Sequence, residues 1–146
     1  MQLDATEQVL IVGSFRALAV DAPAASACFY RHLFRIRPET QHLFVENTVR
    51  QGAKLAQTLR VIVEQIGNWG LLRTTIGDLA VRHLAYGVRA EHYDAVGEAL
   101  LAMLAERLGP LWTDEMRRVW SKAYDGISAE MIAAAYFVEE AEPTEL

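Results

Sequence analysis

Hydrophobic residues recur along this chain at the three- and four-residue steps of an amphipathic helix. The clearest case is the segment with Leu55, Leu59, Ile62 and Ile66, which form one apolar stripe. Comparable stripes occur between residues 76 and 83, 93 and 104, and 116 and 131. No alternating strand pattern of useful length interrupts them, so the pattern predicts an all-α protein.

Capping residues and prolines set the boundaries of the first two predicted helices. Asp4 followed by Glu7 resembles a capping box and opens a helix that runs to about Val20. A second helix begins near Pro23, which suits a first turn. It stops before Pro38, because the residue preceding a proline avoids the helical region.

The middle of the chain carries a short element and two breaks. Pro38-Glu39 opens a short helix that ends near Phe44. A polar joint follows, in which Asn47 and Thr48 are candidate caps of the next helix. That helix is the one with the clearest stripe, and Gly67–Gly70 is predicted to break it.

Glycine and threonine divide the last part of the chain. Gly87 suits the left-handed residue after a helix, and it ends a helix that carries His83 on its apolar face. Gly109-Pro110 stops the next helix. Thr113 then caps a final long helix with acidic residues in its first turn.

Length and charge limit the class of protein. A chain of 146 residues fits one compact domain, for which we predict residues 1–138, followed by an acidic, flexible tail at 139–146. The net charge of −5 offers no general attraction to nucleic acid or to an anionic membrane. No stretch approaches the roughly 20 apolar residues of a spanning helix, so we expect no membrane partner.

Cysteine content and the N-terminal residues bear on the compartment. Cys28 is the single cysteine, which rules out an internal disulfide, and we interpret it as a small buried hydrophobe. The N-terminus carries no basic residue before Arg16 and does not resemble a signal peptide. A cytoplasmic location is therefore the expectation.

His83 is the strongest candidate for a residue with a chemical role. A lone histidine on an apolar helix face is more often a core residue than a metal ligand. Here, however, Tyr30 and Gln51 also occupy inward-facing helical positions, where a polar side chain is costly unless the core holds a hydrogen-bonding partner. A haem iron carrying a diatomic ligand would be such a partner.

Several segments together resemble bacterial globins, namely the single-domain globins and the haem domain of flavohaemoglobins. In chain order these segments are FYRHLF at 29–34, PE at 38–39, LF at 43–44, RHLAYGV at 82–88, HYDAVGEALL at 92–101 and WSKAY at 120–124. The resemblance covers roughly residues 4–135. It implies the globin fold, a helical sandwich enclosing one haem b (iron protoporphyrin IX).

The resemblance also implies roles for individual residues of the haem pocket. His83 would be the proximal iron ligand, and Phe44 the ring that packs on the porphyrin. Tyr30 and Gln51 would donate hydrogen bonds to bound oxygen, beside an apolar wall formed by Leu55.

Further implied contacts lie at the edges of the haem. Val88 would touch the haem edge on the proximal side, and Tyr93 would hydrogen-bond near the proximal histidine. Lys54 and Arg82 are candidate partners of the haem propionates, although a solvated helix face is an equally good interpretation. His32, His42 and His92 are most simply interpreted as surface histidines, and Trp120 as a packing residue.

Two departures from the flavohaemoglobin pattern stand out. The position at which those proteins place a glutamate against the proximal histidine is Ala135 here, and Glu130, the nearest acid, lies more than one turn earlier. This puts an electron-rich, peroxidase-like iron in doubt. The sequence also contains no Gly-x-Gly-x-x-Gly motif, so reductive turnover is expected to need an external flavin reductase.

The sequence thus predicts a bacterial haem globin that binds dioxygen tightly and reversibly, together with carbon monoxide and nitric oxide. The same pocket permits nitric oxide dioxygenation with a separate reductase. Oxygen storage, oxygen transport, nitric oxide detoxification and nitrite chemistry stay open as roles. The alternatives are a haem-based gas sensor acting through a partner protein and a haem-free interaction module.

Overall fold

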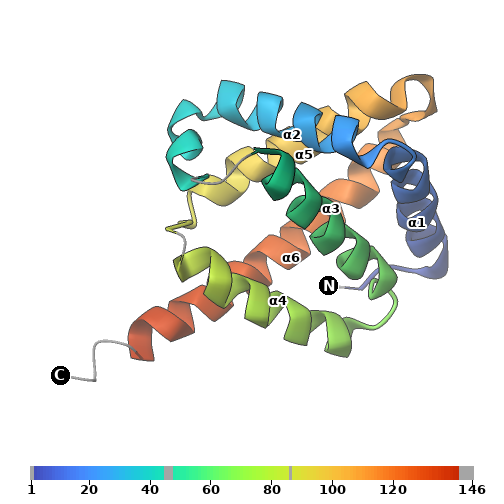
Figure 1. Ribbon diagram of the computed structural model, residues 1–146. Helices are drawn as coiled ribbons and strands as arrows, with labels where there is room; N and C mark the ends of the chain where they lie inside the picture. The colour runs from blue at the N-terminus through green and yellow to red at the C-terminus, as the bar shows by residue number, and fades with distance from the viewer. Residues whose placement is uncertain (1, 45–47, 86, 142–146) are drawn as a thin grey trace.

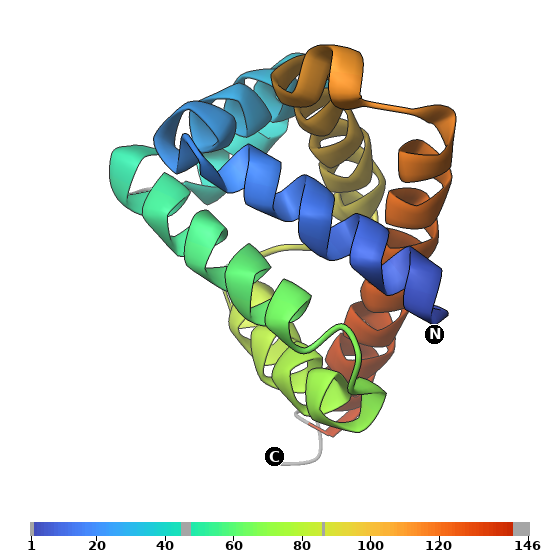
Figure 2. The ribbon, with the colours of Figure 1, turned by 90° about the vertical axis from the view of Figure 1, so that its right-hand side faces the viewer.

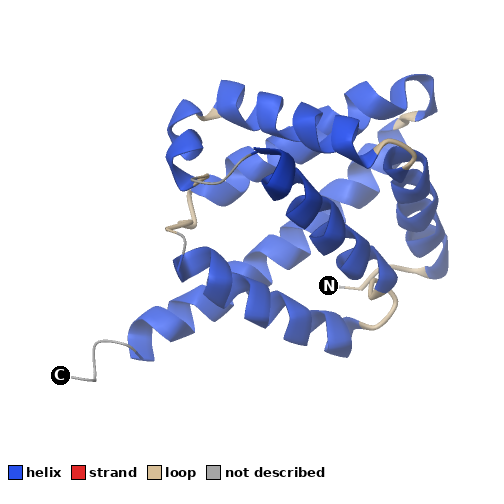
Figure 3. Cartoon of the chain, viewed as in Figure 1, coloured by secondary structure: helices blue, strands red, loops and turns tan. Residues whose placement is uncertain are grey.

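The computed structural model describes residues 2–44, 48–85 and 87–141, and those parts contain helices and loops but no strand (Figure 3). The elements, in chain order, are α1 (Ala5–Ala19), α2 (Ala22–Ile36), η1 (Pro38–Leu43), α3 (Thr48–Glu64), α4 (Trp69–Ala85), α5 (His92–Leu108), η2 (Gly109–Leu111) and α6 (Asp114–Ala141). No single described helix is long and apolar enough to cross a membrane. Among the described helices, only α1 and α2 taken together reach the length and apolar content of a spanning segment, and the two are bent by 100°.

The helix boundaries confirm most of the predicted caps. Asp4 and Glu7 form a reciprocal capping box at the start of α1. The Thr113 hydroxyl accepts a hydrogen bond from the Met116 main-chain N–H at 3.1 Å at the start of α6. Gly87 has the positive φ of 91° expected after α4.

Two boundaries differ from the prediction. Helix α4 already begins at Trp69, because the Asn68 side-chain oxygen accepts a hydrogen bond from the Leu71 N–H at 3.2 Å and so caps the helix. At the other end of the chain, α6 continues to Ala141, three residues into the predicted tail. The predicted cap Asn47 and residues 142–146 lie outside the described residues.

The helices enclose one core. Figure 1 shows α3 crossing in front and α6 behind, with α2 and α5 above and α4 below. Figure 2 shows α1 closing one side between α3 and α6. The largest fully buried side chains come from α1, α2, η1, α4, α5 and α6, and they are Ile11, Leu33, Thr40, Leu72, Ile76, Met103, Leu104 and Val119. The apolar faces of these helices, joined by Val63 of α3, thus form the core, as the stripes predict.

Helices α2 and α3 approach unusually closely where they cross. The Ser26 hydroxyl donates a hydrogen bond to the Gly52 carbonyl at 3.0 Å, and both residues are buried. A Cβ atom added at Gly52 would lie 2.9 Å from the Ser26 Cβ. Glycine at position 52 therefore permits a crossing that a larger residue would push apart.

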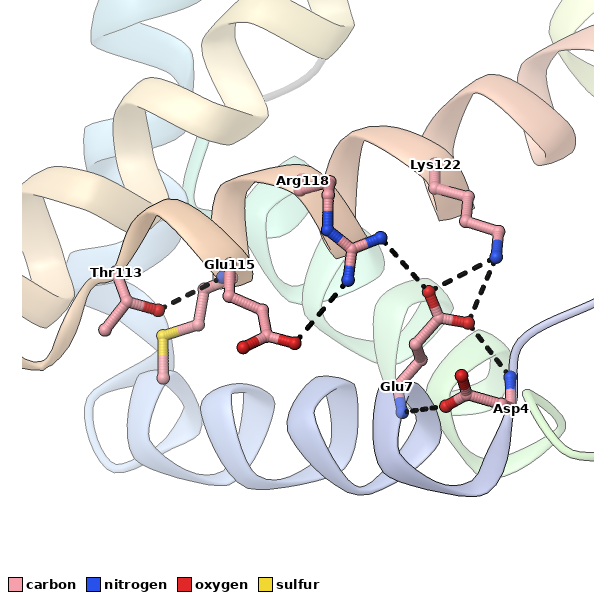
Figure 4. A network of polar contacts seen from close by, with 7 residues as sticks. Asp4, Glu7, Thr113, Glu115, Arg118 and Lys122 are labelled. Atoms are coloured by element: carbon pink, nitrogen blue, oxygen red, sulfur yellow. Dashed lines mark hydrogen bonds and ion pairs between the residues drawn. The ribbon is translucent and has the colours of Figure 1, made fainter.

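A buried carboxylate joins α1 to α6 (Figure 4). The Glu7 side chain is only 7% exposed, and Lys122 Nζ lies 3.0 Å from its Oε1. Arg118 Nη1 lies 3.4 Å from its Oε2. The hydrogen bond from the Asp4 main-chain N–H, followed by that from Lys122, holds the pKa of Glu7 below its ordinary value of 4.5.

Replacing Glu7 with Gln should lower the free energy of unfolding at neutral pH. Because the folded-state pKa of Glu7 is depressed, the ionised carboxylate stabilises the fold above pH 4.5, and this contribution is lost as the pH falls below that value. Urea unfolding at neutral pH and at several values below pH 4.5 should show the difference between wild type and Glu7→Gln shrinking with acidity. Glu115→Gln, which removes an exposed carboxylate from the same Arg118, is the control and should have little effect. A difference that stays constant with pH contradicts the assignment.

Replacing Gly52 with Ala should destabilise the protein by about 1–3 kcal/mol, the usual effect of overpacking. In a Ser26→Gly background the same substitution should cost much less, because the clashing Cβ is gone. Gly13→Ala, at a helical position with no atom within 4 Å of the added Cβ, is the matched control and should be neutral or stabilising. Denaturant unfolding of the four proteins of the Gly52/Ser26 cycle tests this, and strictly additive effects would exclude the clash.

Candidate functional site

His83 lies in the last turn of α4, half-buried, with its ring oriented by the helix itself. Its Nδ1 lies 2.8 Å from the Leu79 carbonyl oxygen. A carbonyl only accepts, so Nδ1 carries the proton, and Nε2 of the neutral ring has the free lone pair. Burial lowers the pKa of His83, against the opposing effect of the Leu79 hydrogen bond. Both features favour the neutral imidazole that binds metals.

The end of α4 fixes the position of His83. The Val88 N–H donates to the His83 carbonyl at 3.0 Å, and the Gly87 N–H donates to the Leu84 carbonyl at 3.0 Å. These bonds close the helix directly after the histidine. Val88 is half-buried and packs against the core.

Aromatic rings of α2 and the residue after η1 form a cluster around Tyr30. The Phe44 ring lies edge-on to Tyr30, with ring centroids 5.1 Å apart, and Phe34 stacks on Tyr30 at 5.8 Å. Phe29 makes a further edge contact at 5.2 Å. Phe44, predicted to face the cofactor, is thus held in an apolar aromatic environment.

Tyr30 contacts the main chain of α3 at Gln51, and the predicted role of the two side chains toward a bound gas stays a prediction. The buried Tyr30 hydroxyl donates a hydrogen bond to the Gln51 main-chain carbonyl at 3.2 Å. Burial raises the pKa of Tyr30 to about 12, so the phenol keeps its proton and remains a donor.

The other residues predicted on α3 and α4 differ in exposure. Leu55 is half-buried and lines a cavity of about 30 Å³ between α1, α2, α3 and α5, together with Phe15, Ser26 and Met103. Lys54 and Arg82 are exposed, on α3 and α4 respectively. Their predicted pairing with the haem propionates stays a prediction.

Tyr93 is buried at the start of α5, and its role near the proximal histidine stays a prediction. Among the described residues no hydrogen bond joins it to His83, whose Nδ1 already contacts Leu79. Instead, the Tyr124 hydroxyl donates to the Tyr93 main-chain carbonyl at 2.6 Å. The Tyr124 ring lies against Gly97, where an added Cβ would be 2.7 Å from its Cε2.

Sequence reasoning missed this role of Tyr124 and assigned it only to an apolar stripe. A signal was present, because Gly97 stands inside a helix, where glycine is unfavourable without a packing reason.

Three polar residues outside the predicted haem pocket, namely Glu130, His32 and Cys28, contact charged side chains. Glu130 pairs with Arg73 of α4, with 3.6 Å between Arg73 Nε and Glu130 Oε2, so its partner is an arginine rather than His83. The interpretation of His32 as a surface residue is wrong: its side chain is only 15% exposed and contacts Glu106 of α5. Cys28 is buried as predicted, although its Sγ also contacts Glu106.

The donor set suits haem rather than a bare metal ion. A bare catalytic or structural ion usually takes three or four protein ligands. His83 instead offers one neutral imidazole nitrogen, and the predicted pocket adds aromatic rings and a protonated phenol. A single histidine in an apolar, aromatic environment is typical of a haem pocket.

Comparisons with known proteins agree with this arrangement. A profile of the globin family matches residues 27–131. A flavohemoprotein from Rhizobium meliloti is 34% identical over 103 residues, which cover 68% of this chain and 26% of that protein. A flavohemoprotein from Bordetella pertussis is 30% identical over 128 residues, covering 86% of this chain and 32% of that protein. The chain therefore spans between about a quarter and a third of the length of these curated relatives.

A solved structure extends the match over nearly the whole of both chains. It is an engineered carbene transferase, a variant of a candidate nitric oxide dioxygenase from Rhodothermus marinus. It superposes with a TM-score of 0.84 at 33% identity and covers 95% of this chain and 97% of its own. With the family profile matching most of its length and this fold shared end to end, the chain belongs to the globin family.

Proposed function

We propose that this globin binds haem b through His83 and holds dioxygen reversibly beside Tyr30 and Gln51. Membership of the globin family implies a haem cofactor and binding of diatomic gases. Haem, when bound, supplies an iron atom that takes dioxygen, carbon monoxide or nitric oxide as a ligand. The chain's own residues then set how firmly the cofactor and the gas are held.

The observation that carries the proposal is the state of the His83 ring. The Leu79 carbonyl fixes the proton on Nδ1, so Nε2 is the nitrogen that would coordinate iron. Burial lowers the pKa of the ring, which favours its neutral form. The Leu79 carbonyl belongs to the main chain, so no side-chain substitution at Leu79 removes it. The helix itself therefore sets the orientation of the His83 ring.

The Tyr30 hydroxyl would be the main hydrogen-bond donor to a bound gas. It stays protonated, and its ring is held among Phe29, Phe34 and Phe44. Rotation of the phenol O–H from the Gln51 carbonyl would direct its proton to a ligand. Gln51 supplies a second donor through its side-chain amide.

The remaining predicted residues complete the proposed pocket. Phe44 would pack on the porphyrin, Val88 would touch the haem edge on the proximal side, and Leu55 would form an apolar wall. Tyr93 packs beside the proximal region. Lys54 and Arg82 are exposed and charged, as partners of haem propionates must be, and we propose them in that role.

Nitric oxide dioxygenation is a second proposed activity, supported by the similarity of this chain to a candidate nitric oxide dioxygenase from Rhodothermus marinus. Tyr30 and Gln51 would hold dioxygen for reaction with nitric oxide to give nitrate. Regeneration of ferrous iron requires an electron donor, and we propose a flavin reductase in that role.

Replacing His83 with Ala should abolish firm haem binding, because the only proposed protein bond to iron is lost. The absorption spectrum of the purified variant, with the amount of haem per chain, tests this. His42→Ala, an exposed histidine on η1, is the control and should retain haem. A His83→Ala protein with an unchanged ferrous spectrum would show that another residue is the ligand.

Replacing Tyr30 with Phe should speed oxygen release by roughly one to two orders of magnitude. A hydrogen bond to a group that develops charge contributes ~1.5–3 kcal/mol, and ~1.4 kcal/mol is a factor of ten. Carbon monoxide carries less negative charge on its outer atom, so its release should change much less. Stopped-flow dissociation of both gases, also from Gln51→Ala, measures the effect.

Tyr124→Phe is the matched control for Tyr30→Phe, because it also removes one hydroxyl bond to a main-chain carbonyl. Its oxygen release should change far less than that of Tyr30→Phe, while its loss of stability should be similar. Equal acceleration of oxygen and carbon monoxide release by Tyr30→Phe would indicate a steric effect and exclude the hydrogen-bonding role.

A further inference from the structure

Three potential metal ligands meet where α2 packs on α5, outside the proposed haem site. Cys28 and His32 lie one turn apart on α2, and Glu106 comes from α5. Cys28 Sγ is 3.2 Å from Glu106 Oε2, and His32 Nε2 is 3.0 Å from Glu106 Oε1. The ligand atoms of all three residues lie within 4.8 Å of one another.

These separations are close to those of a bound tetrahedral ion. Zinc takes sulfur, nitrogen and oxygen ligands at ~2.0–2.3 Å, which places neighbouring ligand atoms roughly 3.3–3.7 Å apart. Small side-chain movements would therefore bring the three ligand atoms to the distances of a zinc site. Glu106 is 46% exposed at the side chain, so the cluster opens to solvent on that side.

An arginine now supplies the positive charge at this position. Arg31 Nη2 lies 3.5 Å from Cys28 Sγ and also pairs with Glu106. The hydrogen bond from Arg31 is the main reason that the pKa of Glu106 falls to about 2. Burial raises the pKa of the Cys28 thiol to about 11, so without a metal the thiol keeps its proton. The Arg31 side chain is 61% exposed and is free to move into water.

We propose that Cys28, His32 and Glu106 bind a zinc ion, which replaces the Arg31 guanidinium as the cation between α2 and α5. One thiolate, one imidazole and one carboxylate form a donor set typical of zinc, whereas magnesium and calcium prefer oxygen ligands alone. Three protein ligands leave a fourth position for water.

The proton balance of binding follows from the contacts. The Cys28 S–H bond breaks, its proton goes to solvent, and a zinc–sulfur bond forms. Glu106 binds as the carboxylate. Arg35 donates to His32 Nδ1 at 3.0 Å, so the His32 proton is now on Nε2. Binding of zinc at Nε2 requires this proton to transfer to Nδ1, as the exposed Arg35 withdraws.

Zinc binding to the purified protein tests the proposal. Dialysis against buffers of defined free zinc, followed by elemental analysis, should give one zinc per chain at micromolar free zinc. Loss of even an outer-shell partner costs a metal site about 10–100-fold in affinity, so Cys28→Ser, His32→Gln and Glu106→Gln should each weaken binding at least about tenfold. His42→Gln, an exposed histidine away from the cluster, should leave it unchanged.

Two measurements separate this site from adventitious surface binding. Zinc K-edge X-ray absorption should show one sulfur neighbour at ~2.3 Å in the wild type and none in Cys28→Ser. Arg31→Gln should tighten zinc binding, because it removes the competing cation. If Cys28→Ser fails to fold, Glu106→Gln still tests the site, because Glu106 is an exposed residue. Absence of binding at micromolar zinc, a purely nitrogen and oxygen environment, or binding lost in His42→Gln overturns the proposal.

Discussion

The close crossing of α2 and α3 is the constraint on which the distal half of the proposed haem site depends. Ser26 and Tyr30 lie one turn apart on α2, and their hydroxyls donate to the neighbouring carbonyls of Gly52 and Gln51 in the first turns of α3. The Ser26 contact is possible only because residue 52 has no side chain. Since Tyr30 also touches Phe44, the same crossing positions the aromatic cluster.

The proximal half uses a comparable device between α5 and α6. A glycine at 97 admits the Tyr124 ring, and the Tyr124 hydroxyl bonds to a main-chain carbonyl one turn away, at Tyr93. His83, by contrast, is positioned by its own helix, through the Leu79 carbonyl and the hydrogen bonds that end α4. Both halves therefore rely on main-chain carbonyls to orient side chains.

Local signals in the sequence were sufficient for the all-α class and for most helix ends, because caps, prolines and apolar stripes act within a few residues, whereas the globin fold was implied by the resemblance. The Asp4–Glu7 capping box and the ends of α2 illustrate this. Contacts between distant residues were not predictable in the same way. Periodicity places Tyr124 on a buried face, but only the packing of α5 shows that its hydroxyl meets the Tyr93 carbonyl. His32 looked solvated because nothing local indicates that Glu106, 74 residues later, packs over it.

The Glu7 network has a consequence for the order in which the chain can assemble. Glu7 and Lys122 are separated by 115 residues, so during synthesis the carboxylate leaves the ribosome long before its charge partners exist. Desolvating it earlier would bury an unpaired charge, which is strongly unfavourable. The N-terminal end of α1 must therefore stay hydrated until α6 is made, and closing so long a loop carries an entropic cost that slows this docking step relative to the local formation of the helices.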